Sequence, residues 1–199
     1  MATVGVGNPP DPPYADGRFS NGKVFAEVIA ENFGAGELTA SWSGCTIYSY
    51  GGTRSMIDRY ALPGLLIPSV RHQVMNCLAD AGGAADPGAL YILHDGGNDS
   101  FFASSMSKAG QWDAAVALPR QSAQGIVGSV ALLAEHGVPF ISWFRMPLVS
   151  ASHRVSAVSI ADSSSIQRSV FAVFVRSAHA LLEVSKQSEA LIFEELGLG

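Results

Sequence analysis

The sequence of 199 residues has few cysteines, few charges and no basic cluster, and each shortage argues against a class of protein. Two cysteines, Cys45 and Cys77, belong to no CxxC or His/Cys ligand pattern, so no metal site is predicted and small buried thiols are favoured over a disulfide. Twelve basic residues against seventeen acidic ones argue against a nucleic-acid partner. No apolar run reaches about 20 residues, so no membrane-spanning helix is expected.

The start of the chain, MATVGVGNPPDPPY, lacks the basic and apolar regions of a signal peptide. We expect no leader in this chain, and the composition leaves its compartment open. Hydrophobic residues make up 48% of the chain, which suits a globular domain with a sizeable core. We therefore expect residues 1–199 to form a single domain.

Helical and extended patterns alternate along the chain. Helices are predicted at 21–33, at 70–81, from about 120 to 135 and at 165–187. The first has Asn21 as N-cap and ends before Gly34, and the second is capped near Ser69 and ends before Gly82. The third carries Ile126, Val127, Val130 and Leu133 on one face. Strands are predicted at 45–50, 88–94, 138–146 and 189–195. Loops are expected at 1–20 and at 150–165.

This alternation predicts an α/β fold, in which helices cover both faces of a parallel sheet. Such sheets bind ligands beyond the carboxyl ends of their strands, where the turns YGGT and GGND both fall. Glycine permits a sharp turn, and this alone explains each glycine pair. Asn98, however, adds an amide donor, and Gly51 and Gly52 offer backbone N–H groups. Donors of these two kinds together can stabilise a developing oxyanion.

Three segments, PPYADGRFSNGKVFAEVIAENFG, YSYGGT and LHDGGND, resemble in order and spacing the GDSL esterases and lipases of the SGNH hydrolase superfamily. The likeness is to the branch with a GRFSNG segment after a proline-rich loop, and it extends through GVPFISWFRMPLV to ALIFEE. It implies a three-layer α/β/α, flavodoxin-like fold with a five-stranded parallel sheet. It also implies hydrolysis of carboxylic esters or lipids through an acyl-serine intermediate, with a small-molecule or lipid ester as substrate and no cofactor. Members of the family are often secreted.

The resemblance assigns two candidate catalytic positions. Gly52 matches the glycine whose backbone N–H serves the oxyanion hole, with Gly51 as the alternative, and Asn98 matches the side-chain donor. The asparagine that usually begins the glycine block is Ile47 here, which removes a local hydrogen bond but leaves the two donors.

The family's nucleophile block, Gly-Asp-Ser, and its Asp-x-x-His block do not occur in the sequence. We therefore expect a chain that is incomplete at both ends, lacks the first and central strand, and is inactive by itself. A sheet without its central strand should give a marginal or aggregation-prone fold, without a sharp cooperative melting transition well above about 50 °C.

Other candidates for the missing chemistry are weaker. His94 and Asp95 adjoin the Asn98 turn, but neighbours at a strand end point to opposite faces and make a poor dyad. Structural or solvated roles are favoured for the remaining candidates, His72, His136, His153, His179 and Ser20.

Two other functions agree with the sequence to different degrees. A non-catalytic binding module on a degenerate fold of the same type agrees with surviving turns and an absent nucleophile. A nucleotide-binding, flavodoxin-like or Rossmann-like protein is less favoured, because there is no GxGxxG motif and no P-loop, and because GGNDS is not followed by a clear helical pattern.

Overall fold

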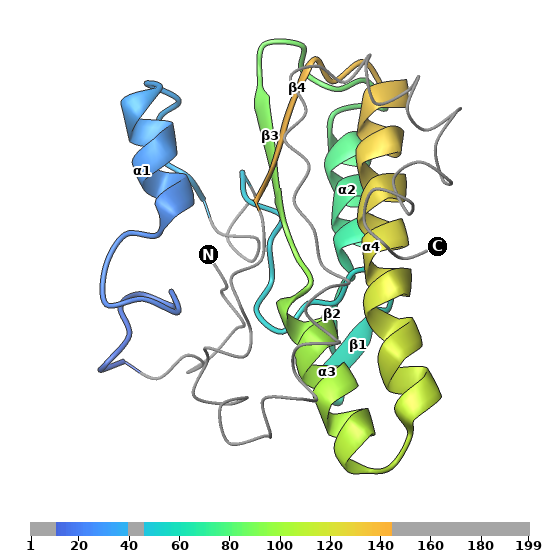
Figure 1. Cartoon of the computed structure of the whole chain (residues 1–199). Helices are drawn as coiled ribbons and strands as arrows, with labels where there is room; N and C mark the ends of the chain where they lie inside the picture. The colour runs from blue at the N-terminus through green and yellow to red at the C-terminus, as the bar shows by residue number, and fades with distance from the viewer. Residues whose placement is uncertain (1–10, 40–45, 145–199) are drawn as a thin grey trace. The chain divides into compact units, whose positions relative to one another are not determined.

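The computed structural model of the chain describes residues 11–39 and 46–144 (Figure 1). Within these ranges the structure is mixed α/β, with four helices, one parallel pair of strands and one antiparallel pair. The α/β class is thus confirmed. The predicted loop at 150–165, helix at 165–187 and strand at 189–195 lie outside the described residues.

The described residues form two compact units. The first contains residues 11–39, 46–53 and 58–68, and the second contains residues 54–57 and 69–144. The single domain expected from the composition stays a prediction.

Helix α1 (Phe25–Asn32) belongs to the first unit and begins later than predicted. The N-cap is Val24 and not Asn21, because the Glu27 carboxylate accepts a hydrogen bond of 2.8 Å from the Val24 N–H. The Arg18 guanidinium, from the GRFSNG segment, holds Glu27 in this position through contacts of 2.8 to 3.1 Å. The stop at Gly34 is confirmed, since this glycine has a φ of 66° directly after the helix.

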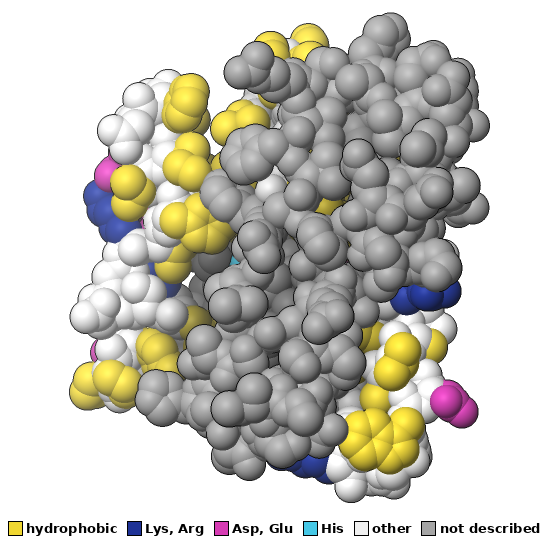
Figure 2. Space-filling model, in the orientation of Figure 1, with side chains coloured by type: hydrophobic (Ala, Val, Ile, Leu, Met, Phe, Trp, Pro, Cys, Tyr) yellow, Lys and Arg dark blue, Asp and Glu magenta, His cyan; other side chains and the backbone are white. Residues whose placement is uncertain are grey.

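The apolar stripe of α1 is only partly buried. Phe25, Val28 and Phe33 are exposed, and Figure 2 shows hydrophobic side chains gathered on the surface of this helix. Ala30 is its buried residue.

An antiparallel hairpin, which the sequence patterns did not predict, completes the first unit. Strands β1 (Arg59–Leu62) and β2 (Leu65–Ile67) pair across a turn at Pro63 and Gly64. Of the strand predicted at 45–50, the structure describes residues 46–50, and it does not assign them to a strand.

The second unit is built on two parallel strands. Strands β3 (Leu90–His94) and β4 (Phe140–Phe144) pair in register from Leu90 opposite Phe140 to His94 opposite Phe144. Helices α2 (Val70–Asp80) and α4 (Trp112–Glu135) lie side by side, and both contribute to the core against these strands (Figure 1). The predicted caps of α2 are confirmed, with Ser69 accepting a hydrogen bond from the His72 N–H and Gly82 adopting a positive φ.

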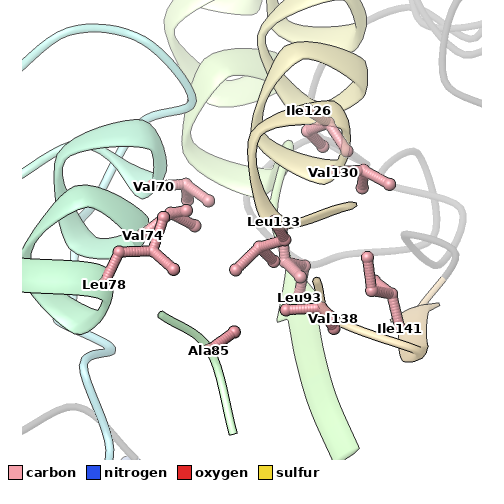
Figure 3. Packing of buried hydrophobic residues seen from close by; sticks show 10 residues of the cluster. All are labelled: Val70, Val74, Leu78, Ala85, Leu93, Ile126, Val130, Leu133, Val138 and Ile141. Atoms are coloured by element: carbon pink, nitrogen blue, oxygen red, sulfur yellow. The ribbon is translucent and has the colours of Figure 1, made fainter. Parts of the chain in front are cut away.

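The core of the second unit is a single apolar cluster (Figure 3). It combines side chains of α2, β3, α4 and β4 with two from the connecting loops, Ala85 and Val138. The residues of the elements are Val70, Val74, Leu78, Leu93, Ile126, Val130, Leu133 and Ile141. The predicted buried face of α4 is confirmed at Ile126, Val130 and Leu133, whereas Val127 is only half-buried. On the other face of the strands, the register partners Leu90 and Phe140 are exposed.

Two helices differ from the sequence predictions. Helix α3 (Gly97–Lys108) follows the GGND turn directly, so the prediction that no clear helix follows this turn is wrong. Helix α4 begins at Trp112 and not near Arg120, and it accommodates Pro119 in its interior. Pro119 is almost fully buried, and its packing offsets the cost of about 3 kcal/mol that proline imposes inside a helix.

Candidate functional site

The turn between β3 and α3 places Asn98 at the carboxyl end of a parallel strand. The strand ends at His94, and Gly96 adopts a left-handed conformation with a φ of 97° that only glycine reaches without strain. Helix α3 then starts at Gly97, so Asn98 lies in its first turn. The Ser100 hydroxyl and N–H both donate to the Gly96 carbonyl and fix the turn. An abrupt strand–turn–helix therefore presents an amide side chain where α/β folds bind ligands.

The residue after Asn98 joins this turn to a distant segment. The Asp99 carboxylate accepts three hydrogen bonds of 2.9 Å, from the Arg54 guanidinium, the Ser55 N–H and the Ser55 hydroxyl. All three residues are buried. Because buried hydrogen bonds to charged groups are strong, Asp99 fixes the segment 54–57 against the first turn of α3. This segment directly follows the Gly51-Gly52 turn in the sequence.

Small residues on α4 accommodate the same segment. The Ser55 hydroxyl contacts the hydroxyl of Ser122, and a Cβ added to Gly125 would overlap the Met56 side chain. Ser122 and Gly125 lie three residues apart and therefore share one face of α4. This face lets the 54–57 segment approach the helix backbone closely.

Asp95 contributes a second buried carboxylate to this region. Burial raises the pKa of Asp95 to about 6, whereas hydrogen bonds from Ser55 and from the Gly96 N–H act in the opposite direction. Its Oδ2 has no hydrogen-bond partner in the described part of the chain, and neither has the buried Nη2 of Arg54. The Arg54 guanidinium lies 4.5 Å from the centroid of the Phe102 ring, a favourable cation–π contact. Arg54, Ser55, Asp95, Asp99 and Ser122 thus form a buried polar cluster. It contains one cation, two carboxylates and two atoms that have no hydrogen-bond partner in the described part of the chain.

Gly52, the other predicted donor, lies in the first unit. It adopts a φ of 79°, and an added Cβ would lie 3.3 Å from Nη2 of Arg59. Among the hydrogen bonds of residues 11–39 and 46–144, none is donated by the N–H of Gly51 or Gly52. The Arg59 side chain comes from β1, and its buried Nε lacks a partner within the same residues.

Of the weaker candidates, the structure describes His72, His94, Asp95, His136 and Ser20. At the end of β3 the side chain of His94 is exposed and that of Asp95 is buried, so the two do not form a dyad. His136 ends α4 and its Nδ1 lies 2.8 Å from the Leu132 carbonyl. The Ser20 hydroxyl accepts a hydrogen bond from the Gly22 N–H within a turn. His153, His179 and Cys45 lie outside the described residues.

Residues 11–39 and 46–144 contain neither a group of metal ligands nor a helix able to cross a membrane. No group of three or more His, Cys, Asp and Glu side chains could hold a metal ion in this part of the chain. No helix within it has the length and apolar character needed to cross a membrane. No protein-family model matches the sequence, and a search of curated proteins gave no match either.

The sequence patterns missed the buried polar cluster of Arg54, Ser55, Asp95, Asp99 and Ser122. One signal could have indicated it: Ser122, Gly125 and Ser129 recur on a single helical face that is otherwise apolar. Small residues at this spacing indicate that another part of the backbone packs closely against the helix. Which segment packs there, and that it brings a buried ion pair, is visible only in the structure.

Proposed function

We propose that the chain carries the oxyanion-binding part of a GDSL-type ester hydrolase. The observation that supports this most is the left-handed Gly96 turn, which starts α3 at the end of β3 and places Asn98 in the first helical turn. In this proposal the Asn98 amide donates to the carbonyl oxygen of an ester. The family resemblance alone assigns the second donor to the Gly52 N–H, with the Gly51 N–H as the alternative.

These donors act on charge that develops during the reaction. When a nucleophile attacks the carbonyl carbon, the oxygen gains negative charge, and each fixed donor lowers the barrier by about 2.7–4 kcal/mol. Asn98 is suited to this role because Asp99, its neighbour, is held by three hydrogen bonds and limits the motion of the turn. The Gly52 N–H donates no bond within the described chain, so it is available to a substrate.

The donors alone do not hydrolyse an ester. Acyl transfer to serine needs a nucleophile and a base within hydrogen-bond reach, and the sequence contains neither Gly-Asp-Ser nor Asp-x-x-His. Ser55 does not replace the nucleophile, because it is only 1% exposed and bonded to Asp99. We therefore expect no acyl-serine turnover from these 199 residues by themselves.

The same proposal includes a three-layer fold. Helices α2 and α4 both pack in the core on one face of the β3–β4 pair. The exposed Leu90 and Phe140 lie opposite each other on the other face, which supports a second helical layer there.

The reading frame on both sides of this sequence provides the first test. We expect a Gly-Asp-Ser motif upstream and an Asp-x-x-His motif downstream, and a frame with neither would contradict the hydrolase proposal. The product of the full frame should hydrolyse p-nitrophenyl acetate and butyrate. In that protein Asn98→Ala should lower kcat by about 10²–10³-fold. Lys108→Gln, a change at an exposed position in the last turn of α3, serves as a control that leaves the amide in place.

A binding module on the same fold is the second candidate, and the missing Gly-Asp-Ser motif favours it. The protein encoded by the full reading frame distinguishes the two. If it binds an acyl ester saturably and does not hydrolyse it, the binding module is supported and the hydrolase is contradicted. Turnover that depends on Asn98 would do the reverse.

A further inference from the structure

Arg59 is a cation for which the described chain provides no counter-ion. No ion pair or hydrogen bond of residues 11–39 and 46–144 involves this side chain. Its Nε is buried and has no partner. A buried donor without an acceptor is costly, and in native proteins such a group indicates an unseen ligand or water.

The Arg59 guanidinium lies close to the position that a side chain at residue 52 would occupy. A Cβ at this position would lie 3.3 Å from Nη2 and 3.4 Å from Cζ of Arg59. The planar group therefore lies directly against the Gly52 backbone, whose N–H also donates no bond in the described chain. Both donor groups belong to the first unit, so their proximity does not depend on the second unit.

A planar guanidinium beside a backbone N–H suits a planar anion with two oxygens. Arginine binds carboxylates through two parallel hydrogen bonds, and the Gly52 N–H adds a donor. We infer that Arg59 and the Gly52 N–H form a binding subsite for a carboxylate, of the kind released when the acyl group of an ester is hydrolysed. The inference rests on the proposed function for the identity of the acid, but the binding itself needs no nucleophile.

Titration of the 199-residue chain with butyrate, and with the neutral butyramide as a matched probe, tests the subsite. We expect saturable binding of butyrate, with the amide resonance of Gly52 shifting in NMR spectra, and no corresponding shift with butyramide. Arg59→Gln should raise the Kd for butyrate at least about tenfold, because a charge-assisted pair of bonds is lost. The Kd of Arg59→Lys should lie between those of the wild type and Arg59→Gln, since lysine keeps the charge but cannot form two parallel hydrogen bonds.

Arg71→Gln is the matched control, because it removes the same charge from α2 and should leave the Kd unchanged. An unchanged Kd in Arg59→Gln, no binding of butyrate to the wild type, or equal binding of butyramide would each overturn the inference. If Arg59→Gln does not fold, the wild type still tests the inference, through the shift of its Gly52 amide resonance with butyrate and not with butyramide. Failure of the hydrolase proposal has a different signature, namely ester turnover that is absent or independent of Asn98 in the full-frame protein.

Discussion

The apolar core and the polar cluster of the second unit are both buried, but they depend on different physical effects. In the core, residues such as Leu133 and Val138 are 1% exposed and belong to the apolar cluster. In the polar cluster, Asp99 is 3% exposed and binds Arg54 and Ser55. Apolar burial is non-directional and roughly proportional to area, whereas a buried charge is tolerated only when specific partners are in place.

These two effects predict different losses of stability when a residue is substituted. A core residue that is shortened loses contacts in proportion to the volume removed. A member of the polar cluster that is lost leaves its partner charged, buried and unpaired. The cluster should therefore be the more sensitive region per atom changed. Three variants test this, from the largest expected effect to the smallest, and a fourth at the N-cap of α2 gives a smaller reference effect.

Asp99→Asn should be the most destabilising, by about 3–5 kcal/mol, because it removes the carboxylate that pairs with the buried Arg54 guanidinium. Urea denaturation of the wild type and the variant measures the difference. The double variant Arg54→Met/Asp99→Leu, which removes both charges, should recover much of the loss. A loss below about 1 kcal/mol in Asp99→Asn would show that the cluster resembles an exposed ion pair.

Leu133→Ala should destabilise the second unit by about 2–5 kcal/mol, because it opens a cavity in the core. Leu132→Ala is the matched control on the same helix, since Leu132 is only partly buried, and it should have a smaller effect. Equal losses at the two positions, measured by the same denaturation, would contradict the assigned core face of α4.

Asp95→Asn should change the pH dependence of stability. The native pKa of about 6 lies above the value of 3.8 for an unburied aspartate, so the native state holds the proton more tightly than the unfolded chain. As the pH rises from about 4 to about 7, ionisation of Asp95 should remove roughly 3 kcal/mol of stability from the wild type relative to Asp95→Asn. A difference between the two proteins that is constant over this pH range would refute the shifted pKa.

Ser69→Ala should have the smallest effect, about 0.5–2 kcal/mol, through loss of the N-cap of α2. Ser69→Gly should cost only a few tenths of a kcal/mol, because glycine is itself tolerated at the N-cap position. The reverse order, in thermal or urea denaturation, would show that the hydroxyl contributes through a different contact.

Errors in the sequence predictions were concentrated where tertiary contacts override local preference. Residues 97–108 form a helix although Gly97 and four serines give it a weak apolar pattern, and its Asp99 is held by Arg54 and Ser55. A helix start was predicted near residue 120, but the structure begins α4 at Trp112 and buries Pro119 within it. At Asn21 the predicted cap was displaced by the Arg18–Glu27 pair.

The sequence by itself determined the local features of this protein. These include the α/β class, the Ser69 cap, the stops at Gly34 and Gly82, the parallel strands at 90–94 and 140–144, and the buried face of α4. All of them depend on periodicity and on the conformational preferences of neighbouring residues. Only the tertiary structure showed that Asp99 binds a segment 44 residues earlier and that Arg59 lies against Gly52. Contacts of this kind join side chains far apart in the sequence, and they are decided by which backbones pack together and which charges must be satisfied when they do.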